Sequence, residues 1–158
     1  NREELAQLLS RPEIFDLPAS ILHANLDGRI MIDDGEDSRV GGFLNFSKSA
    51  ANFPWKSNAA WLYAQMVRWG ETQMSAEASA RAQATYRPDL HRAALAPLGV
   101  PLPTANSKME GALAVDTAVP STVGRLFLAA DGFFDGRVFD PDRIEEYVAE
   151  LRAADQRD

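Results

Sequence analysis

The chain has 158 residues, of which 46% are hydrophobic and 25% are charged, as in a typical globular domain with one buried core. Its net charge of -7 and its pI near 4.8 argue against nucleic-acid binding, because that needs clustered Lys and Arg and no three basic residues are adjacent. No apolar run approaches the roughly 18 residues that a membrane-spanning helix needs, and the absence of Cys excludes disulfides and Cys-ligated zinc.

Two short helices are predicted at the N-terminus. Residues 2–10 carry leucines at helical spacing and end before Pro12, which lacks a backbone donor and clashes with a preceding helical turn. Residues 16–25 form a second helical stretch, with Pro18 at an opening position. We expect this pair of helices to bury a small apolar face.

A hairpin is predicted directly after these helices. Asp27-Gly28 can form a turn with a positive φ, and residues 29–32 are typical of a short strand that pairs with residues 43–46. The acidic run at residues 33–37 resembles a calcium loop in composition but lacks its twelve-residue ligand spacing, so a solvated turn is favoured.

The clearest helix of the chain follows Ser57, a good N-cap residue, and ends at Trp69. Leu62, Met66 and Trp69 share one face at helical spacing, and we expect this face to be buried in the core. Trp61 points about 100° away from Leu62, so it should lie at the edge of the face, partly exposed. Trp61 is therefore the candidate for contact with a partner.

Two further helices and an irregular segment follow. Residues 75–85 are Ala-rich, and Pro88 opens a helix over residues 89–96, so a helical hairpin is predicted. Residues 99–120 are rich in proline and lack periodicity, which is typical of a segment that runs over a surface and predicts an internal linker.

The C-terminal part predicts a second hairpin and a final helix. Asp135-Gly136 lies between aromatic and β-branched residues within 133–139, a strong hairpin signal. Asp140 is then placed as a helix cap, with Pro141 at the first helical position. The residues expected on the buried stripe of this helix are Ile144, Tyr147, Val148 and Leu151.

The chain carries no motif that indicates an enzyme. It has no nucleophile elbow, no dinucleotide fingerprint and no Walker loop. Its two histidines, His23 and His91, lie on predicted helices without a second histidine to complete a ligand pair on one face. We therefore predict no catalytic residue, metal site or cofactor, and expect both histidines to be partly exposed helix residues.

Aromatic and basic residues supply the remaining candidates for a binding site. The aromatic side chains between residues 53 and 69 could line a ligand cleft, but a role in the core is favoured. Lys56, Arg68 and Lys108 are the candidate donors for an oxyanion, which is held by charge-assisted hydrogen bonds. For each of them, an ordinary surface position is the favoured interpretation.

Five strings of residues together resemble the nitrate- and bicarbonate-binding family of solute-binding proteins. The most specific string is 50–61, AANFPWKSNAAW, continuing to QMVRWG at 65–70, although Asn58 stands where this motif more commonly has His. The supporting strings, in the order of the family, are 1–5 with 8–12, 86–90, 107–111 and 133–141. The resemblance spans nearly the whole chain.

This resemblance implies a fold, a function and partners. It implies a helix-rich α+β chain that forms the C-terminal part, residues 1–158, of a type II periplasmic-binding-protein-like α/β fold with two lobes. It implies a nitrate-like oxyanion as ligand, and either a permease of an ABC transporter or an antiterminator regulator as partner. It allows either the periplasm or the cytoplasm as the cellular location. The residues that touch the anion are expected outside this segment.

Two functions of different classes follow from these observations. In the first, the chain is the scaffold segment of a small-anion-binding protein for transport or nitrate sensing, and alone it binds nitrate weakly or not at all. In the second, it is a protein-interaction module whose aromatic helix docks a regulatory partner and that has no ligand site.

Overall fold

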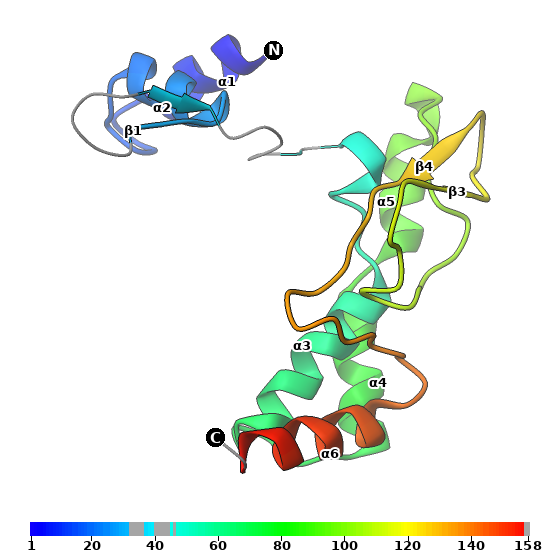
Figure 1. Cartoon of the computed structure of the whole chain (residues 1–158). Coiled ribbons are helices and arrows are strands. Elements are labelled where there is room, and N and C mark those ends of the chain that lie inside the picture. The colour runs from blue at the N-terminus through cyan, green and yellow to red at the C-terminus, as the bar shows by residue number, and fades with distance from the viewer. Residues whose placement is uncertain (32–36, 40–44, 46, 157–158) are drawn as a thin grey trace. The chain divides into compact units, whose positions relative to one another are not determined.

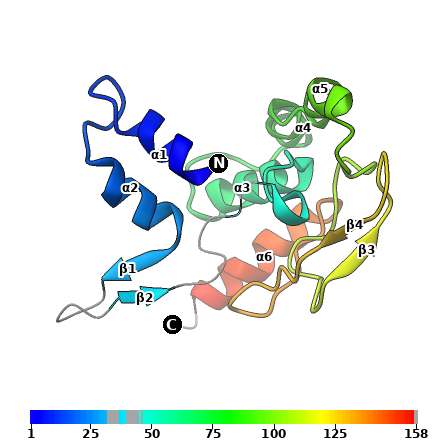
Figure 2. The same cartoon turned by 90° about the horizontal axis from the view of Figure 1, so that it is seen from above.

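The computed structural model describes residues 1–31, 37–39, 45 and 47–156 (Figures 1 and 2). The chain divides into two compact units, Asn1–Phe46 and Ser47–Asp158, rather than the one core that its length and composition favoured. Within the described residues, no helix has both the length and the apolar character needed to cross a membrane.

The first unit is built on the two predicted helices, α1 (Arg2–Leu9) and α2 (Ala19–Leu26), which pack against each other. The side chain of Asn1 caps α1 by accepting a hydrogen bond of 3.1 Å from the amide of Glu3. Gly28 follows α2 with a φ of 72°, as the predicted turn requires. Both helices are therefore confirmed.

A short antiparallel ribbon completes this unit, but with a different partner strand from the predicted one. β1 (Arg29–Met31) pairs with β2 (Asp37–Arg39), and Arg29 lies opposite Arg39. Closing onto β2 takes a much shorter loop than closing onto residues 43–46, and short connections are the commoner ones. Residues 33–36 and 43, 44 and 46 lie outside the described residues.

The second unit has its main core between three helices, α3 (Lys56–Arg68), α4 (Ala76–Thr85) and α6 (Ile144–Asp155). Figure 1 shows α4 beside α3 and α6 crossing near the lower end of both, and α3 packs against α4 and α6. This core contains Ala60, Tyr63, Ala64, Val67, Phe139, Ile144, Tyr147, Val148 and Leu151. The predicted buried stripe of the last helix is confirmed in full.

The buried face of α3 is the opposite of the predicted one. Leu62, Met66 and Trp69 are 48%, 43% and 65% exposed, whereas the face that carries Ala60 and Ala64 is buried. Small side chains let two neighbouring helices approach α3 closely, which bulky residues at the same positions would prevent. The predicted cap is also wrong, because α3 begins at Lys56 and Ser57 lies buried inside its first turn.

The helix after α4 is α5 (Pro88–Leu95), followed by a 3-10 turn, η2 (Ala96–Leu98). Both helices were predicted, but they do not form a hairpin. α4 packs on α3, and α5 continues beyond the end of α4 instead of folding back along it (Figure 1). The joint between them includes Tyr86 in an extended conformation, which carries the chain onward.

A second, smaller core lies at the other end of α3. It contains Ala50, Phe53, Trp55, Leu126 and Leu128. The antiparallel strands β3 (Thr117–Val119) and β4 (Leu126–Leu128) contribute to it, as does a 3-10 turn, η1 (Lys48–Ala50). Phe53 and Trp55 meet edge to face, with their ring centroids 4.7 Å apart.

Residues 99–120 differ in part from the predicted surface linker. They contain β3, and Leu102, Pro103 and Glu110 among them are buried. Glu110 also exchanges backbone hydrogen bonds with Phe139. The burial of this segment could not be predicted from strand periodicity, because proline interrupts regular strand hydrogen bonding without preventing burial.

The region before α6 keeps the predicted turn but not the predicted strands. Gly136, with a φ of 69°, donates a 3.0 Å hydrogen bond to the carbonyl of Phe133. Phe139 then pairs with Glu110 instead of with the other side of its own turn. The helix begins only at Ile144, and Asp140 accepts instead from the amide of Asp142 at 2.9 Å.

Candidate functional site

The three predicted anion donors do not come together in the structure. Lys56 begins α3, Arg68 ends it, and Lys108 lies in the segment that follows η2. A rise of 1.5 Å per residue separates the two ends of α3 by about 18 Å, which is far too long for one small oxyanion to bridge. The three residues therefore do not form one site.

Arg68 is held by a carboxylate of the same chain. Its Nε donates to Asp155 Oδ2 at 2.8 Å, and its Nη2 donates to the other carboxylate oxygen. This bidentate hydrogen bonding lowers the pKa of Asp155 and raises the pKa of Arg68. The pair joins the ends of α3 and α6, so the guanidinium serves the fold.

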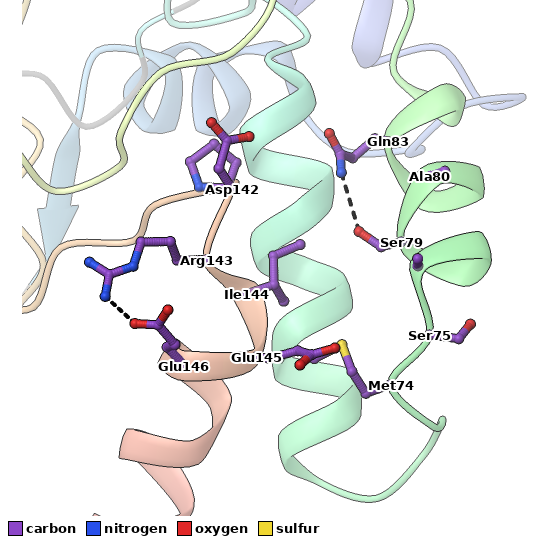
Figure 3. A pocket seen from close by; sticks show the side chains of 12 residues that line it. Met74, Ser75, Ser79, Ala80, Gln83, Asp142, Arg143, Ile144, Glu145 and Glu146 are labelled. Carbon is purple, nitrogen blue, oxygen red and sulfur yellow. Dashed lines mark hydrogen bonds and ion pairs between the residues drawn. The ribbon is translucent and has the colours of Figure 1, made fainter.

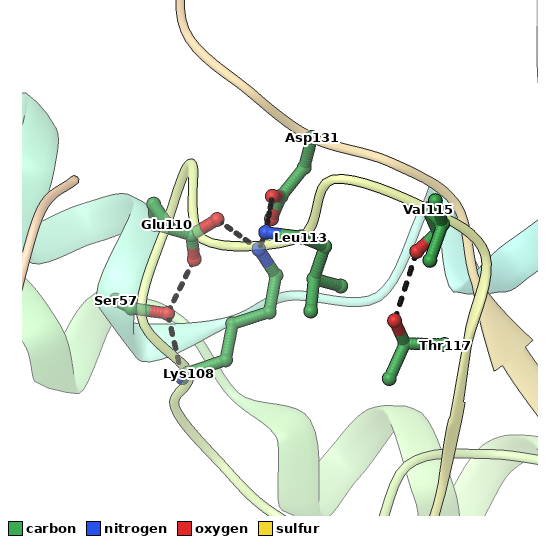
Figure 4. A network of polar contacts seen from close by, with 7 residues as sticks. All are labelled: Ser57, Lys108, Glu110, Leu113, Val115, Thr117 and Asp131. Atoms are coloured by element: carbon green, nitrogen blue, oxygen red, sulfur yellow. Dashed lines mark hydrogen bonds and ion pairs between the residues drawn. The ribbon is translucent and has the colours of Figure 1, made fainter. Parts of the chain in front are cut away.

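Lys108 lies in a polar network between loops and the start of α3 (Figure 4). Its ammonium donates to the carboxylates of both Glu110 and Asp131. Ser57 donates to the second oxygen of Glu110 at 2.6 Å, and its hydroxyl accepts from the amide of Lys108 at 3.1 Å. The remaining oxygen of Asp131 accepts from the amide of Leu113 at 2.8 Å.

This network is unsuited to an anion. Glu110 is 8% exposed, and the one ammonium faces two carboxylates, so the ionised group carries a net negative charge. A bound oxyanion would have to displace one of these carboxylates from the ammonium of Lys108 and leave that carboxylate without its partner. The network is a structural anchor for the loop 107–111, one of the strings by which the chain resembles the solute-binding family.

A further basic residue, Arg92 of α5, was missed by the sequence analysis. It donates to the carbonyls of Pro103, Thr104 and Ala105 and to the side chain of Asn106, at 2.5 to 3.0 Å. It also lies over the ring of Phe53, 5.0 Å from the centroid. No local pattern reveals this role, because backbone carbonyls eleven or more residues away leave no mark in the sequence.

The aromatic residues are mainly core residues, as the sequence analysis favoured. Phe53, Trp55 and Tyr63 are buried. Trp61, the predicted partner contact, is half-buried: its indole donates to the hydroxyl of Tyr147 at 3.2 Å and stacks on Phe133. Its polar and aromatic groups are thus already used within the second unit.

The two histidines lie in different units. His23 is half-exposed, and its Nδ1 is 3.7 Å from the carboxylate of Asp27. His91 packs edge to face on Phe53, and its Nε2 is buried without a hydrogen-bond partner. Within the described residues, no group of three or more acidic or histidine side chains is arranged to hold a metal ion.

Among the described residues, each unit has an open cavity that could admit a small molecule. A cavity of about 460 Å³ lies between α4 and the start of α6 (Figure 3). Asp142, Glu145 and Glu146 line it, and its Arg143 is paired with Glu146, so its surface is acidic. Such a surface repels an oxyanion.

The cavity of the first unit lies between α1, α2 and β1 and measures about 510 Å³. Its polar lining comprises Glu3, Gln7, Ser20, His23 and Arg29. The guanidinium of Arg29 is 3.7 Å from Asp27, which also pairs with Arg2 at 3.2 Å. One carboxylate, Asp27, thus pairs with both arginines, and Glu3 adds a second negative charge in the lining. This cavity therefore has no marked excess of positive charge.

No protein-family profile matches the chain, but individual proteins and solved structures do. The bicarbonate-binding protein CmpA of Synechococcus elongatus is 30% identical over 161 aligned positions, which cover 96% of this chain and 32% of CmpA. The nitrate/nitrite binding protein NrtA of Synechocystis is 28% identical over 96% of this chain and 31% of NrtA. A nitrate import ATP-binding protein of Synechococcus elongatus, NrtC, is 27% identical over 68% of this chain and 16% of its own length.

The structural comparison gives the same result. The crystal structure of the periplasmic nitrate-binding protein NrtA from Synechocystis superposes with a TM-score of 0.67 and 26% identity, covering 96% of this chain and 35% of that protein. The chain spans about a third of the length of CmpA and of NrtA. In sequence and in fold, the chain is homologous to a segment of the nitrate- and bicarbonate-binding solute-binding proteins.

Proposed function

We propose that this chain is the C-terminal segment of a solute-binding protein that takes up a small oxyanion such as nitrate, nitrite or bicarbonate. The observation that carries the proposal is the match over 96% of the chain to proteins named for binding these anions, together with a structural match of the same extent. About two thirds of such a protein lie outside the matched segment. We therefore assign anion binding to the larger protein and not to this segment alone.

The chemistry of the segment supports a role as scaffold rather than as ligand site. Arg68, Arg92 and Lys108 each bind carboxylates or carbonyls of the chain itself. Of the three predicted donors, Lys56 is the one whose side chain makes no ion pair within the described residues. A planar oxyanion needs several converging donors, so one lysine does not suffice for tight binding.

Titration calorimetry tests the proposal. A protein of the relatives' length that contains this segment should release or absorb heat with nitrate, nitrite or bicarbonate, whereas the 158-residue chain should show no micromolar binding. Absence of heat with all three anions in the longer protein contradicts the proposal. Micromolar binding by the chain alone contradicts the scaffold role, and a Lys56→Met variant, with Lys48→Met as control, would then test Lys56 as the donor.

We further propose that the partner is the permease of an ABC transporter. Two relatives support this: NrtC is named as a nitrate import protein that binds ATP, and the solved NrtA is described as periplasmic. Cell fractionation of the longer protein separates this role from nitrate sensing with an antiterminator. Recovery from the periplasm supports transport, and recovery from the cytoplasm contradicts it.

A further inference from the structure

The helix α3 and its C-cap residue Trp69 present three large apolar side chains to solvent on one stripe. Leu62, Met66 and Trp69 follow one another at spacings of four and three residues and therefore lie on the same face. Isolated exposed apolar residues are common on protein surfaces, but a continuous stripe along a central helix is not.

Between Asn58 and Arg68, α3 has no polar face suited to water. Between Asn58 and Arg68 the one polar residue is Gln65, and it is buried. A helix that is apolar all round is typical of the interior of a larger protein. The neighbouring α6 is different, since its exposed positions include Glu145, Glu146, Glu150 and Arg152.

Two faces of α3 are already covered within the unit, by α4 and by α6. Among the described residues, no further element covers the stripe, as the exposure of its three side chains shows. Three side chains offer much less than the roughly 800 Å² per partner of a stable dimer, because one aromatic residue buries about 150 to 250 Å². The stripe is too small to hold a second copy, but it is the right size for one more element of the same protein.

We propose that the stripe Leu62, Met66 and Trp69 packs against an apolar surface from the other two thirds of the solute-binding protein. This inference rests on the proposed function in one respect, that the chain belongs to a protein of its relatives' length. With the stripe covered, α3 becomes the central helix of a larger core and fixes the segment to the rest of the protein.

Fluorescence quenching of Trp69 tests whether the stripe is covered. Trp55 is 6% exposed and Trp61 is half-buried, so Trp69 should account for most of the acrylamide quenching of the 158-residue chain. Trp69→Phe should remove most of this quenching in the chain and change it little in the longer protein. Equal accessibility of Trp69 in both, or a Trp69 already shielded in the chain alone, would overturn the proposal.

Thermal melts of matched serine variants test the contribution to stability. Leu62→Ser and Leu90→Ser replace residues that are 48% and 56% exposed on α3 and α5. Both should leave the melting temperature of the chain nearly unchanged, whereas Leu62→Ser should lower that of the longer protein by several degrees more than Leu90→Ser. Equal shifts of the melting temperature in the longer protein would contradict the proposed packing against the stripe.

Two other outcomes are distinct from these. If sedimentation shows that the 158-residue chain is a dimer that Trp69→Ser dissociates, a second copy occupies the stripe and the proposal is wrong. If the longer protein shields Trp69 but binds none of the three anions, the packing of the stripe is supported while the proposed function fails.

Discussion

The hydroxyl of Ser57, in the first turn of α3, donates a hydrogen bond of 2.6 Å to the carboxylate of Glu110, which lies 53 residues further along the chain. The same hydroxyl accepts from the amide of Lys108, so one small side chain joins the start of the central helix to the loop 107–111. This contact links two of the strings by which the chain resembles its relatives.

Replacing this serine should destabilise the chain. Ser57→Ala leaves a buried carboxylate oxygen of Glu110 and the amide of Lys108 without a partner, which we expect to lower the free energy of unfolding by about 1 to 3 kcal/mol. Ser79→Ala is the control, because the hydroxyl of Ser79 accepts a local hydrogen bond of 3.2 Å from the side chain of Gln83 within α4. Urea unfolding should show a change within about 0.5 kcal/mol for the control, and equal losses would contradict the structural role of Ser57.

Gly111 should be far less replaceable than Gly70. Both have a similar φ, 81° and 78°, so an alanine at either position bears the same left-handed strain, about 1 to 2 kcal/mol. A Cβ on Gly111 would lie 2.7 Å from the carbonyl oxygen of Arg137 and 3.0 Å from the ring of Phe133, whereas at Gly70 nothing lies within 4 Å. The loss for Gly111→Ala should exceed that for Gly70→Ala by about 1 to 3 kcal/mol in urea melts. Equal losses would mean that the two loops do not approach so closely.

Adjacent residues of α3 should differ sharply in their contribution to stability. Val67 is buried between α3 and its neighbours, and Val67→Ala should cost about 1.5 to 3 kcal/mol. Met66 is exposed in the 158-residue chain, and Met66→Ala should change its stability by less than about 0.5 kcal/mol. Chemical denaturation of both variants checks the facing of the helix, and a larger loss for Met66→Ala would reverse it.

The ion pair between Arg68 and Asp155 should make stability depend on pH in the acid range. The pKa of Asp155 is lowered in the folded chain by its hydrogen bond to Arg68, whereas in the unfolded chain it is about 3.9. Below about pH 4 the unfolded state therefore binds the proton first, and the stabilisation present at higher pH is lost as the pH falls.

Urea midpoints of wild type and Asp155→Asn, measured from pH 6 to pH 3, check this expectation. The advantage of the wild type should be greatest at pH 6 and shrink below about pH 4. Asp116→Asn, at an exposed position, is the control and should follow the wild type at every pH. A constant difference between wild type and Asp155→Asn would show that the pair does not form in solution.

Replacement of Arg92 by lysine should destabilise the chain. Lysine has one ammonium and cannot reach four acceptors spread over residues 103–106, so Arg92→Lys should cost about 1 to 3 kcal/mol. Arg81 is highly exposed and meets Glu77 at 3.9 Å, so Arg81→Lys should change the stability by less than about 0.5 kcal/mol. Comparable thermal shifts for the two variants would contradict the clamp that Arg92 forms.

The sequence alone determined those elements whose two sides differ in polarity or whose ends are chemically marked. The last helix shows an apolar stripe of Ile144, Tyr147, Val148 and Leu151 against a charged face, so its buried side could be predicted. The turn at Gly136 could also be predicted, because a positive φ strongly favours glycine. The family resemblance likewise came from local strings of residues.

The tertiary structure decided what depends on distant residues. Between Asn58 and Arg68, α3 carries apolar residues on every side, so periodicity could not choose between its faces. The small side chains of Ala60 and Ala64 decided which face packs against α4 and α6. The partner of Phe139 is Glu110, and the ammonium of Lys108 is held by Glu110 and Asp131. Except for the contact between Lys108 and Glu110, these contacts join residues 23 or more positions apart. Lysine and arginine residues that look available in the sequence are therefore already bound within the fold.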